Sequence, residues 1–298
     1  MDIISRCGYI AIIGKPNVGK STLINALVDM KLSAVSRKMQ TTRHRINAVL
    51  SLNNTQFIFV DTPGFQNKHH SLLNKIMNKT VFNVLSDVDV ILHVVNACQW
   101  TQDDEKISNF IFQNNDIQKI LVINKIDKLK NINILLPYIK NINPKYNYNS
   151  IIPISANKKY QLNTLLDNVS QLLPLRNFIF DESFITDKSE RFLTSEIIKE
   201  KIFRLVGDEL PYKCTVFIEK WQEVKNGIIN IFACIIVERN SHKIILLGSK
   251  GQHIKKIASE ARKDIEILLN KKIYLEVYIK VCKGWLDNKK LLHEFGYE

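Results

Sequence analysis

The sequence is poor in cysteine and contains no long apolar run. Its five cysteines, Cys7, Cys98, Cys214, Cys234 and Cys282, are far apart and odd in number, and no two form a C-x-x-C pair. That spacing argues against a disulfide framework and against a zinc site. No apolar run approaches the length of a membrane-spanning helix, and the N-terminal apolar stretch leads into a glycine-rich turn instead of a signal-peptide cleavage site. We therefore expect buried thiols and a cytoplasmic protein.

Acidic residues are also scarce. The 298 residues include 29 Asp and Glu against 42 Lys and Arg, which gives a formal net charge of +13 and a pI near 9.4. A basic protein suits an anionic partner, either a nucleic acid or an anionic membrane surface. Lys, Asn and Ile are abundant, so a compositional bias of the source could also supply the charge. The length and a hydrophobic content of 45% are enough for two domains with their own cores.

A glycine-rich turn near the N-terminus organises the chain. The apolar run 9–13 leads into Gly14-Lys15-Pro16-Asn17-Val18-Gly19-Lys20-Ser21-Thr22, and a helical pattern follows at 23–27. This order fits G-x-x-x-x-G-K-[ST], in which glycines let backbone N–H groups surround phosphate oxygens. Lys20 can reach the β- and γ-phosphates, and the Ser21 hydroxyl can ligate Mg²⁺. The nucleotide ligands predicted from this turn are Asn17, Val18, Gly19, Lys20, Ser21 and Thr22.

The polar and basic stretch 33–45 has the pattern of a loop that responds to the nucleotide. A threonine in such a loop can close onto Mg²⁺ and the γ-phosphate, which makes the loop a switch. Thr42 is our candidate, and Thr41 is the next choice. An ordinary basic surface loop is the alternative interpretation of this stretch.

A second segment that could respond to the nucleotide is Asp61-Thr62-Pro63-Gly64, which follows a strand pattern at 56–60. An acid at the end of a strand beside a phosphate loop can hold Mg²⁺, and the Gly64 N–H can turn toward a γ-phosphate. All four residues are therefore predicted to lie at the nucleotide. Phe65 stands where many related switches carry a water-orienting glutamine, and we interpret Gln66 as a solvated loop residue.

Two motifs at later strand ends predict that the base is guanine. The apolar run 119–123 ends in Asn124-Lys125-Ile126-Asp127. Guanine presents two donors, N1–H and the exocyclic amine, and one carboxylate, that of Asp127, can accept both. Lys125 can pack its stem along the base or ribose, and Asn124 can tie neighbouring loops together. Ser155-Ala156 follows another apolar run, and its Ala156 N–H could meet the guanine O6. His93 lies in the strand pattern 87–95, which has an acidic start, and is interpreted as a packed core or edge histidine.

Together these segments resemble the translation-factor-related class of small GTPases. Gln40-Thr41-Thr42-Arg43-His44-Arg45 and the apolar Phe65 are more narrowly similar to the Era family of ribosome-assembly GTPases. The resemblance implies an α/β fold, a P-loop GTPase domain with a doubly wound, mostly parallel sheet and its ligand at the C-terminal strand ends.

The same resemblance implies GTP or GDP and Mg²⁺ as ligands. The implied catalytic groups are Lys20, Thr42 and Gly64, and the implied metal site consists of Ser21, Thr42 and Asp61. With Phe65 in the glutamine position we expect slow intrinsic turnover, aided by K⁺ or by RNA.

A second domain follows a linker. We place the first domain at 1–175, the linker at 176–188 and the second domain at 189–298, with a helical tail at its end. The pattern of the second domain is helix, strand, strand, Gly248-Ser249-Lys250-Gly251, helix, strand. Glycines allow a nucleic acid backbone to approach, and Lys250 at the tip can meet phosphate.

Basic residues are concentrated around this G-x-x-G turn. Residues 243–272 include eight Lys or Arg against three Asp or Glu. An ordinary tight turn is the alternative, but its place before a basic helix favours nucleic acid. The layout is similar to an α+β prokaryotic-type KH domain, which the Era family carries. The predicted RNA-binding residues are Gly248, Ser249, Lys250, Gly251, Lys255 and Lys256.

The resemblance implies a GTP-hydrolysing switch that binds 16S ribosomal RNA near its 3′ end and assists assembly of the 30S subunit. We expect a monomer. An RNA-binding module that holds nucleotide only as a structural ligand is one alternative. A GTPase in peripheral contact with the inner face of the cell membrane is another, because the basic surface would suit anionic lipids.

Overall fold

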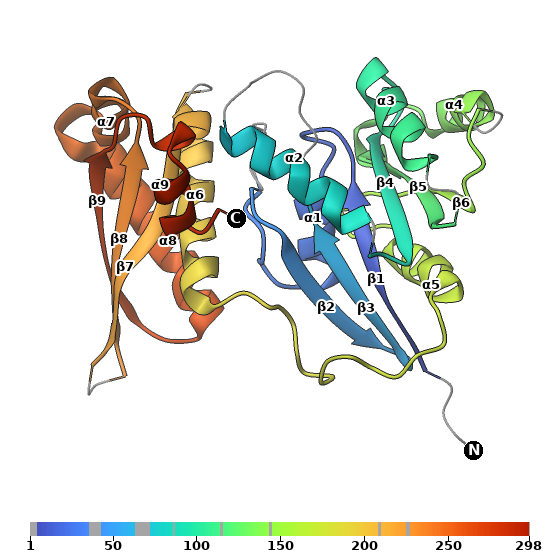
Figure 1. The fold of residues 1–298 in the computed structure, drawn as a ribbon, viewed down its shortest axis with the longest axis horizontal. Helices are drawn as coiled ribbons and strands as arrows, with labels where there is room; N and C mark the ends of the chain where they lie inside the picture. Colours follow the sequence, from blue (N-terminus) through green and yellow to red (C-terminus); the bar gives the residue numbers. More distant parts are fainter. Residues whose placement is uncertain are drawn as a thin grey trace. The chain divides into compact units, whose positions relative to one another are not determined.

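The structure is a computed structural model that describes residues 5–35, 43–62, 72–85, 87–113, 116–142, 145–207, 210–224 and 227–297. Its internal contacts divide the chain into two compact units (Figure 1). The first comprises 1–30, 44–67 and 78–187, and the second comprises 31–43, 68–77 and 188–298. In the described ranges, no helix is both long and apolar enough to cross a lipid bilayer. All five cysteines are free thiols; Cys7, Cys214 and Cys234 are buried, as expected, whereas Cys98 and Cys282 are half-buried.

The first unit is built on one sheet. Its strands are β1 (Arg6–Ile13), β2 (Ile46–Leu52), β3 (Thr55–Asp61), β4 (Val90–Asn96), β5 (Gln118–Asn124) and β6 (Ser150–Pro153). Among the described residues these six strands follow the order β2-β3-β1-β4-β5-β6, in which only β2 runs antiparallel to its neighbour. The predicted doubly wound, mostly parallel sheet is therefore confirmed.

The strand order places the ligand crevice. β3 lies on one side of β1 and β4 on the other, so the direction of winding reverses at β1. In open α/β sheets, ligands bind outside the carboxyl ends of the strands at such a reversal. β1 ends at Ile13, and the glycine-rich turn starts at Gly14. The same edge receives Asp61 from β3 and Asn124 from β5, because the strands are parallel there.

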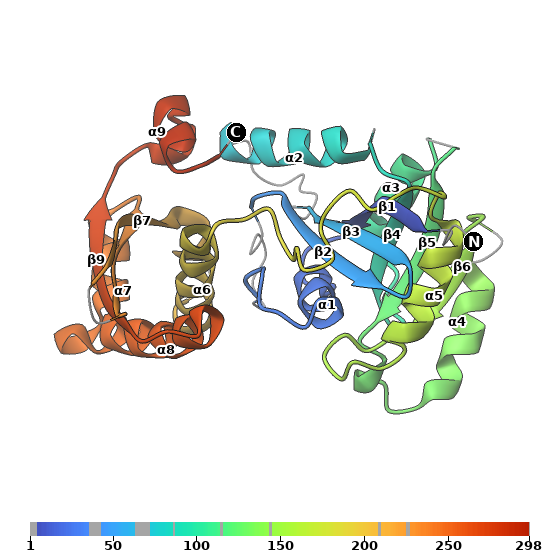
Figure 2. The ribbon, with the colours of Figure 1, turned by 90° about the horizontal axis from the view of Figure 1, so that it is seen from below.

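Helices cover both faces of this sheet (Figure 2). They are α1 (Lys20–Leu27), α2 (Leu72–Leu85), α3 (Gln102–Ile111), α4 (Leu135–Ile142) and α5 (Leu162–Leu172), of which α2 belongs to this unit only from residue 78 onward. Ile107 of α3 and Leu135 of α4 pack in one apolar cluster with Ala11 and Ile13 of β1. Since side chains of a strand alternate between faces, Ile10 and Ile12 point to the opposite face, where α1 and α5 lie. The strands are buried on both faces and therefore read as continuous apolar runs.

The second unit has its own sheet and core. Its elements are α6 (Glu190–Leu205), β7 (Cys214–Glu223), β8 (Ile229–Val237), α7 (Asn240–Leu247), α8 (Gln252–Leu269), β9 (Ile273–Val281) and α9 (Lys289–Glu294). β8 pairs antiparallel with β7 and parallel with β9. One face packs against α6 and α8, where Ile198, Ile231 and Ile265 are fully buried. The other face packs against the C-terminal segment through Trp285.

One element of the second unit was missed in the sequence. The predicted order helix, strand, strand, helix, strand omits α7, which precedes the G-x-x-G turn. Its run Lys243–Leu247 is short and apolar, and such a run does not distinguish a strand from a helix by its period. Burial of Leu246 against the domain core fixes the helix.

The second unit also includes the segment on either side of the predicted Thr42 loop. Lys31 forms ion pairs with Glu200 (2.8 Å) and Asp264 (2.7 Å), and the Val35 N–H donates to the other Glu200 oxygen at 3.0 Å. On the far side, Arg43 donates to the Cys214 carbonyl at 2.9 Å. Both stems of the loop are therefore held by elements of the C-terminal half of the sequence.

Candidate nucleotide-binding site and RNA-binding loop

The turn after β1 has a backbone that side chains would obstruct. A Cβ on Gly14 would lie 2.4 Å from the Val94 carbonyl, and a Cβ on Gly19 would lie 2.4 Å from the Asn124 amide nitrogen. Gly19 also has φ of 100°, and Asn17 has φ of 65°. Glycine tolerates such values at no steric cost, and asparagine is among the residues that adopt them most readily. The glycines of the motif are therefore required by the shape of the turn.

Lys20 lies inside this turn. Its side chain is nearly fully buried, and its Nζ donates to the carbonyls of Gly14 (2.9 Å) and Lys15 (3.0 Å). Burial lowers the pKa of Lys20 to about 8, against the opposing effect of the nearby Asp61 carboxylate. A buried cation whose hydrogen bonds go to neutral carbonyls is suited to receive phosphate oxygens, which would compensate its charge.

We predict that GDP affinity falls above about pH 8. Phosphate binding favours protonated Lys20, so affinity should be constant below the pKa of about 8 and fall by up to about tenfold per pH unit above it. Titrating GDP affinity from about pH 7 to about pH 9 measures this. Guanosine is the control, because it has the same base and no phosphate. A ratio of GDP to guanosine affinity that does not change with pH would contradict the prediction.

Two of the predicted metal ligands, Ser21 and Asp61, lie among the described residues, and they are neighbours. Ser21 Oγ donates to Asp61 Oδ2 at 3.3 Å, and Asp61 is fully buried. Thr62 donates through Oγ1 to the Ile12 carbonyl at 2.9 Å, which holds the start of the Asp61 segment against β1. A hydroxyl and a carboxylate are hard oxygen donors that fit Mg²⁺. Thr42, Pro63, Gly64, Phe65 and Gln66 lie outside the described residues.

Asn124 ties three segments together, as predicted. Its amide nitrogen donates to the Val18 carbonyl at 2.9 Å, and its amide oxygen accepts from the N–H groups of Lys125 (2.7 Å) and Ala156 (3.0 Å). Lys125 Nζ donates to the Asn17 carbonyl. The predicted base-reading motif therefore also anchors the glycine-rich turn 14–21, which we call the phosphate turn. The predicted contact of the Ala156 N–H with guanine O6 stays a prediction, because here that N–H bonds to Asn124.

The carboxylate predicted to read the base is open to a ligand. Asp127 is exposed, and its Oδ1 accepts from Ser155 Oγ at 2.6 Å. Ser155 Oγ in turn accepts from the Lys158 N–H at 3.2 Å, so its own proton is directed at Asp127. This fixes the carboxylate without occupying both of its oxygens.

His93, by contrast, is fully buried, and burial lowers its pKa to about 4, which confirms it as a core histidine that is neutral at pH 7.

Sequence reasoning missed one connection of the phosphate turn. Lys15 Nζ lies 2.7 Å from Asp104 Oδ2 on α3. Asp103, Asp104 and Glu105 look alike in the sequence, as an acidic first helical turn, yet among them Asp104 alone is fully buried. Only a prediction of which helix face meets the turn could have singled it out.

The G-x-x-G turn joins α7 to α8. Gly248 and Gly251 have φ of 67° and 75°, and a Cβ on Gly248 would lie 2.6 Å from the His253 ring. Between them Ser249 and Lys250 are exposed, and Lys250 also has a positive φ, of 50°. Lys255 and Lys256 are exposed in the first part of α8. Two exposed apolar side chains, Ile244 and Ile245 of α7, precede the turn. Cations and apolar groups therefore lie together at the predicted RNA-binding loop.

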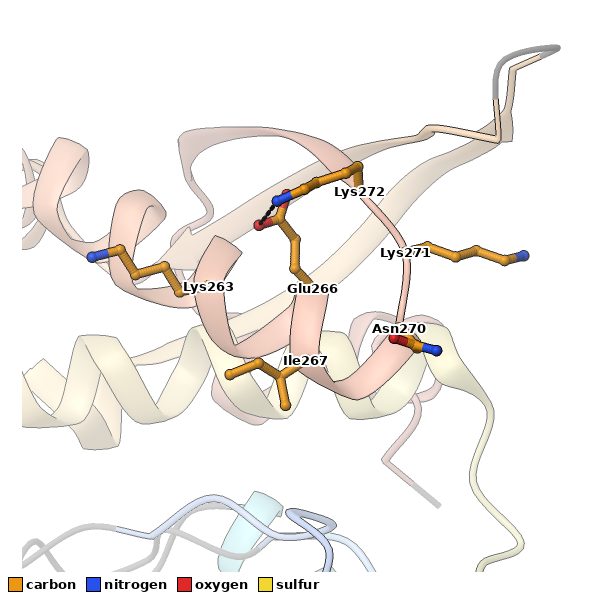
Figure 3. Close-up of a pocket in the computed structure, with 6 residues that line it drawn as sticks. All are labelled: Lys263, Glu266, Ile267, Asn270, Lys271 and Lys272. Atoms are coloured by element: carbon orange, nitrogen blue, oxygen red, sulfur yellow. Dashed lines mark ion pairs between the residues drawn. The ribbon is translucent and has the colours of Figure 1, made fainter.

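A shallow pocket at the other end of α8 is a second basic surface, which can be compared with the G-x-x-G turn (Figure 3). Lys263, Glu266, Ile267, Asn270, Lys271 and Lys272 line it. Its only carboxylate, Glu266, is paired with Lys272 at 3.6 Å and with Arg262 at 3.3 Å. An 18-residue helix is about 27 Å long, so this pocket is well separated from Lys250.

Comparison with known proteins matches both units. A family model described as 50S ribosome-binding GTPase matches residues 9–125, and one described as KH domain matches residues 209–286. GTPase Era of Bordetella avium (strain 197N) is 51% identical over 293 residues, which cover 98% of each chain. GTPase Era of Nitrosomonas eutropha is 45% identical, again over 98% of each chain. That of Haemophilus influenzae (strain PittGG) is 43% identical, over 98% of this chain and 96% of the relative.

Two solved structures resemble the chain over nearly its whole length. A variant of Aquifex aeolicus Era bound to GDP·AlF4⁻ superposes with a TM-score of 0.94 at 37% identity. An Era in complex with MgGDPNP and nucleotides 1506–1542 of 16S ribosomal RNA superposes with a TM-score of 0.94 at 38% identity. In both cases the match covers 98% of this chain and 99% of the other.

Proposed function

The chain belongs to the GTPase Era family, and from this premise we propose that it is a GTP-hydrolysing switch that binds 16S ribosomal RNA near its 3′ end and assists assembly of the small ribosomal subunit. One observation carries the proposal. A guanine-nucleotide site and a basic G-x-x-G loop occur in one chain, and a relative with the same overall structure holds both MgGDPNP and that RNA.

The residues of the site divide the work of hydrolysis. N–H groups of the phosphate turn and Lys20 would stabilise charge that develops at the β–γ bridge oxygen. Ser21 and Asp61 would hold Mg²⁺, which offsets the charge of the phosphates when it is bound. Asp127 would select guanine. With Phe65 in place of a water-orienting glutamine, we expect slow turnover that K⁺ or RNA accelerates.

The GTPase family description and the solved structure with bound RNA name different ribosomal subunits. The GTPase model names the 50S subunit, but it spans only residues 9–125 and contains no RNA-binding loop. The structural relative that holds a 16S fragment covers 98% of this chain, including that loop. The RNA-binding half of the molecule therefore favours the small subunit. We also propose that the protein acts as a cytoplasmic monomer.

Reversing the charge of the loop should abolish RNA binding without affecting nucleotide. We predict that Lys250→Asp weakens binding of a single-stranded 16S 3′ fragment by at least about tenfold, because it replaces a phosphate contact by a repulsive carboxylate. Lys271→Asp is the matched control, since it makes the same charge change on an exposed lysine at the far end of α8. Fluorescence anisotropy measures both, and GDP affinity checks the first unit.

Equal losses in the two variants would show a diffuse electrostatic attraction and refute the assignment of the G-x-x-G turn. Flotation with anionic liposomes at physiological salt tests the peripheral-membrane alternative. Binding to liposomes with no binding to the 16S fragment would overturn the proposed function in favour of that alternative.

A further inference from the structure

The phosphate turn is tethered to α3 by a buried carboxylate. Asp104 Oδ2 accepts from Lys15 Nζ (2.7 Å), from the Thr101 N–H (2.9 Å) and from Thr101 Oγ1 (2.7 Å). Lys15 also donates to the Gln99 carbonyl at 3.3 Å and to Thr101 Oγ1 at 3.1 Å. Asp104 is fully buried, and the Lys15 side chain is 14% exposed. The pair is therefore largely removed from solvent.

A buried carboxylate of this kind requires its cation. Leaving a charge buried and unpaired is strongly destabilising. Within the described ranges, Lys15 is the cation that forms an ion pair with Asp104. The nearby buried His93 does not substitute for it, because burial lowers the pKa of His93 to about 4 and leaves the ring neutral at pH 7. Lys15 is thus strongly held at the start of α3.

Fixing Lys15 fixes the backbone that holds Lys20. The Lys15 carbonyl accepts from Lys20 Nζ at 3.0 Å. Two other carbonyls of the turn are held from outside: that of Val18 by Asn124, and that of Asn17 by Lys125. In a trans peptide the carbonyl and the following N–H point in opposite directions. Carbonyls held on the outside of the turn therefore direct the following N–H groups inward, toward the position of the phosphates.

We propose that Asp104 is a positioning residue for the phosphate turn: through Lys15, it holds the turn in its phosphate-binding shape before nucleotide arrives. Asp104 does not touch the nucleotide itself. Its loss would let the turn adopt other shapes, so that nucleotide binding would have to order it. The loss of Asp104 should therefore weaken binding of the phosphates and leave the guanine contacts of Asp127 unchanged.

The test compares Asp104→Asn with wild type in binding GDP and guanosine. Asparagine can still accept from the Thr101 N–H, so the helix start is kept while the charge is lost. We expect GDP affinity to fall about tenfold and guanosine affinity to stay the same. Glu105→Gln is the matched control. Glu105 lies on the same helix as Asp104, and its ion pair with Lys145 (3.2 Å) is exposed to solvent. That variant should change neither affinity.

A double-mutant cycle identifies the route of the effect. Lys15→Gln should weaken GDP binding by a similar factor, and the combination with Asp104→Asn should be no weaker than either single change, since both break one interaction. Lys15→Arg, which keeps the charge, should retain most of the affinity. Unchanged GDP affinity in Asp104→Asn, a parallel loss of guanosine affinity, or additive effects would overturn the proposal. The inference rests on the nucleotide site, which GDP binding by the wild-type protein tests separately.

Discussion

Replacing Asp127 by asparagine should convert the protein from a guanine binder into a xanthine binder. Guanine offers two donors at its N1–H and exocyclic amine, whereas xanthine offers a donor and an acceptor there. Ser155 donates to Oδ1 of residue 127 and is itself held as a donor by the Lys158 N–H. In Asp127→Asn, the amide oxygen should therefore stay with Ser155, and the amide nitrogen should take the outer position. That arrangement places a donor against the guanine amine and complements xanthine O2.

The expected loss of GDP affinity is at least about 10³-fold, because sites built for specific donors strongly reject ligands that mismatch them. XDP should bind to Asp127→Asn more tightly than to wild type. Competition binding with GDP and XDP measures both effects. Asp103→Asn, at an exposed aspartate on the first turn of α3, is the control and should keep the wild-type preference. Equal losses for GDP and XDP would show that Asp127 holds the fold of the loop and does not read the base.

Removing the Lys20 side chain should nearly abolish hydrolysis. Lys20 is the buried cation of the phosphate turn, and loss of one preorganised donor at developing charge typically costs about 10²–10³-fold in rate. Single-turnover GTP hydrolysis by Lys20→Ala, at saturating protein, separates this effect from weaker binding. Lys106→Ala, on the exposed face of α3, is the control. Undiminished hydrolysis in Lys20→Ala would contradict the assigned role.

Unfolding should not explain that loss. Burial lowers the pKa of Lys20 to about 8, below its ordinary value, so the protonated side chain opposes folding at neutral pH. Below the folded-state pKa this cost is fully present, and it declines as the pH rises through it. In the nucleotide-free Lys20→Ala variant, losing this unfavourable charge should therefore offset part of the stability lost with the buried side chain. Thermal unfolding at about pH 7 and about pH 9, compared with wild type, measures the difference.

Several site residues could be predicted because their signals are local. Strand, glycine turn and helix occupy consecutive residues around Gly14–Ser21, and the steric demands at Gly14 and Gly19 are those of the turn itself. Asp61, Asn124 and Ser155 each follow an apolar run, and parallel strands bring such ends to one edge. The sequence also identified Gly248–Gly251 as a turn. It missed α7 before that turn, because the period of so short an apolar run is ambiguous.

The sequence by itself thus determined which chemical groups are predicted to bind the nucleotide, since each motif is set by the few residues around one strand end. The tertiary structure decided which distant groups hold them in place. Asp104 meets Lys15 across 89 positions, and Glu200 meets Lys31 across 169, with no mark in the sequence that separates either acid from its neighbours. The reason is physical: a turn's backbone depends on its own residues, whereas a buried ion pair depends on which faces of two elements the packing brings together.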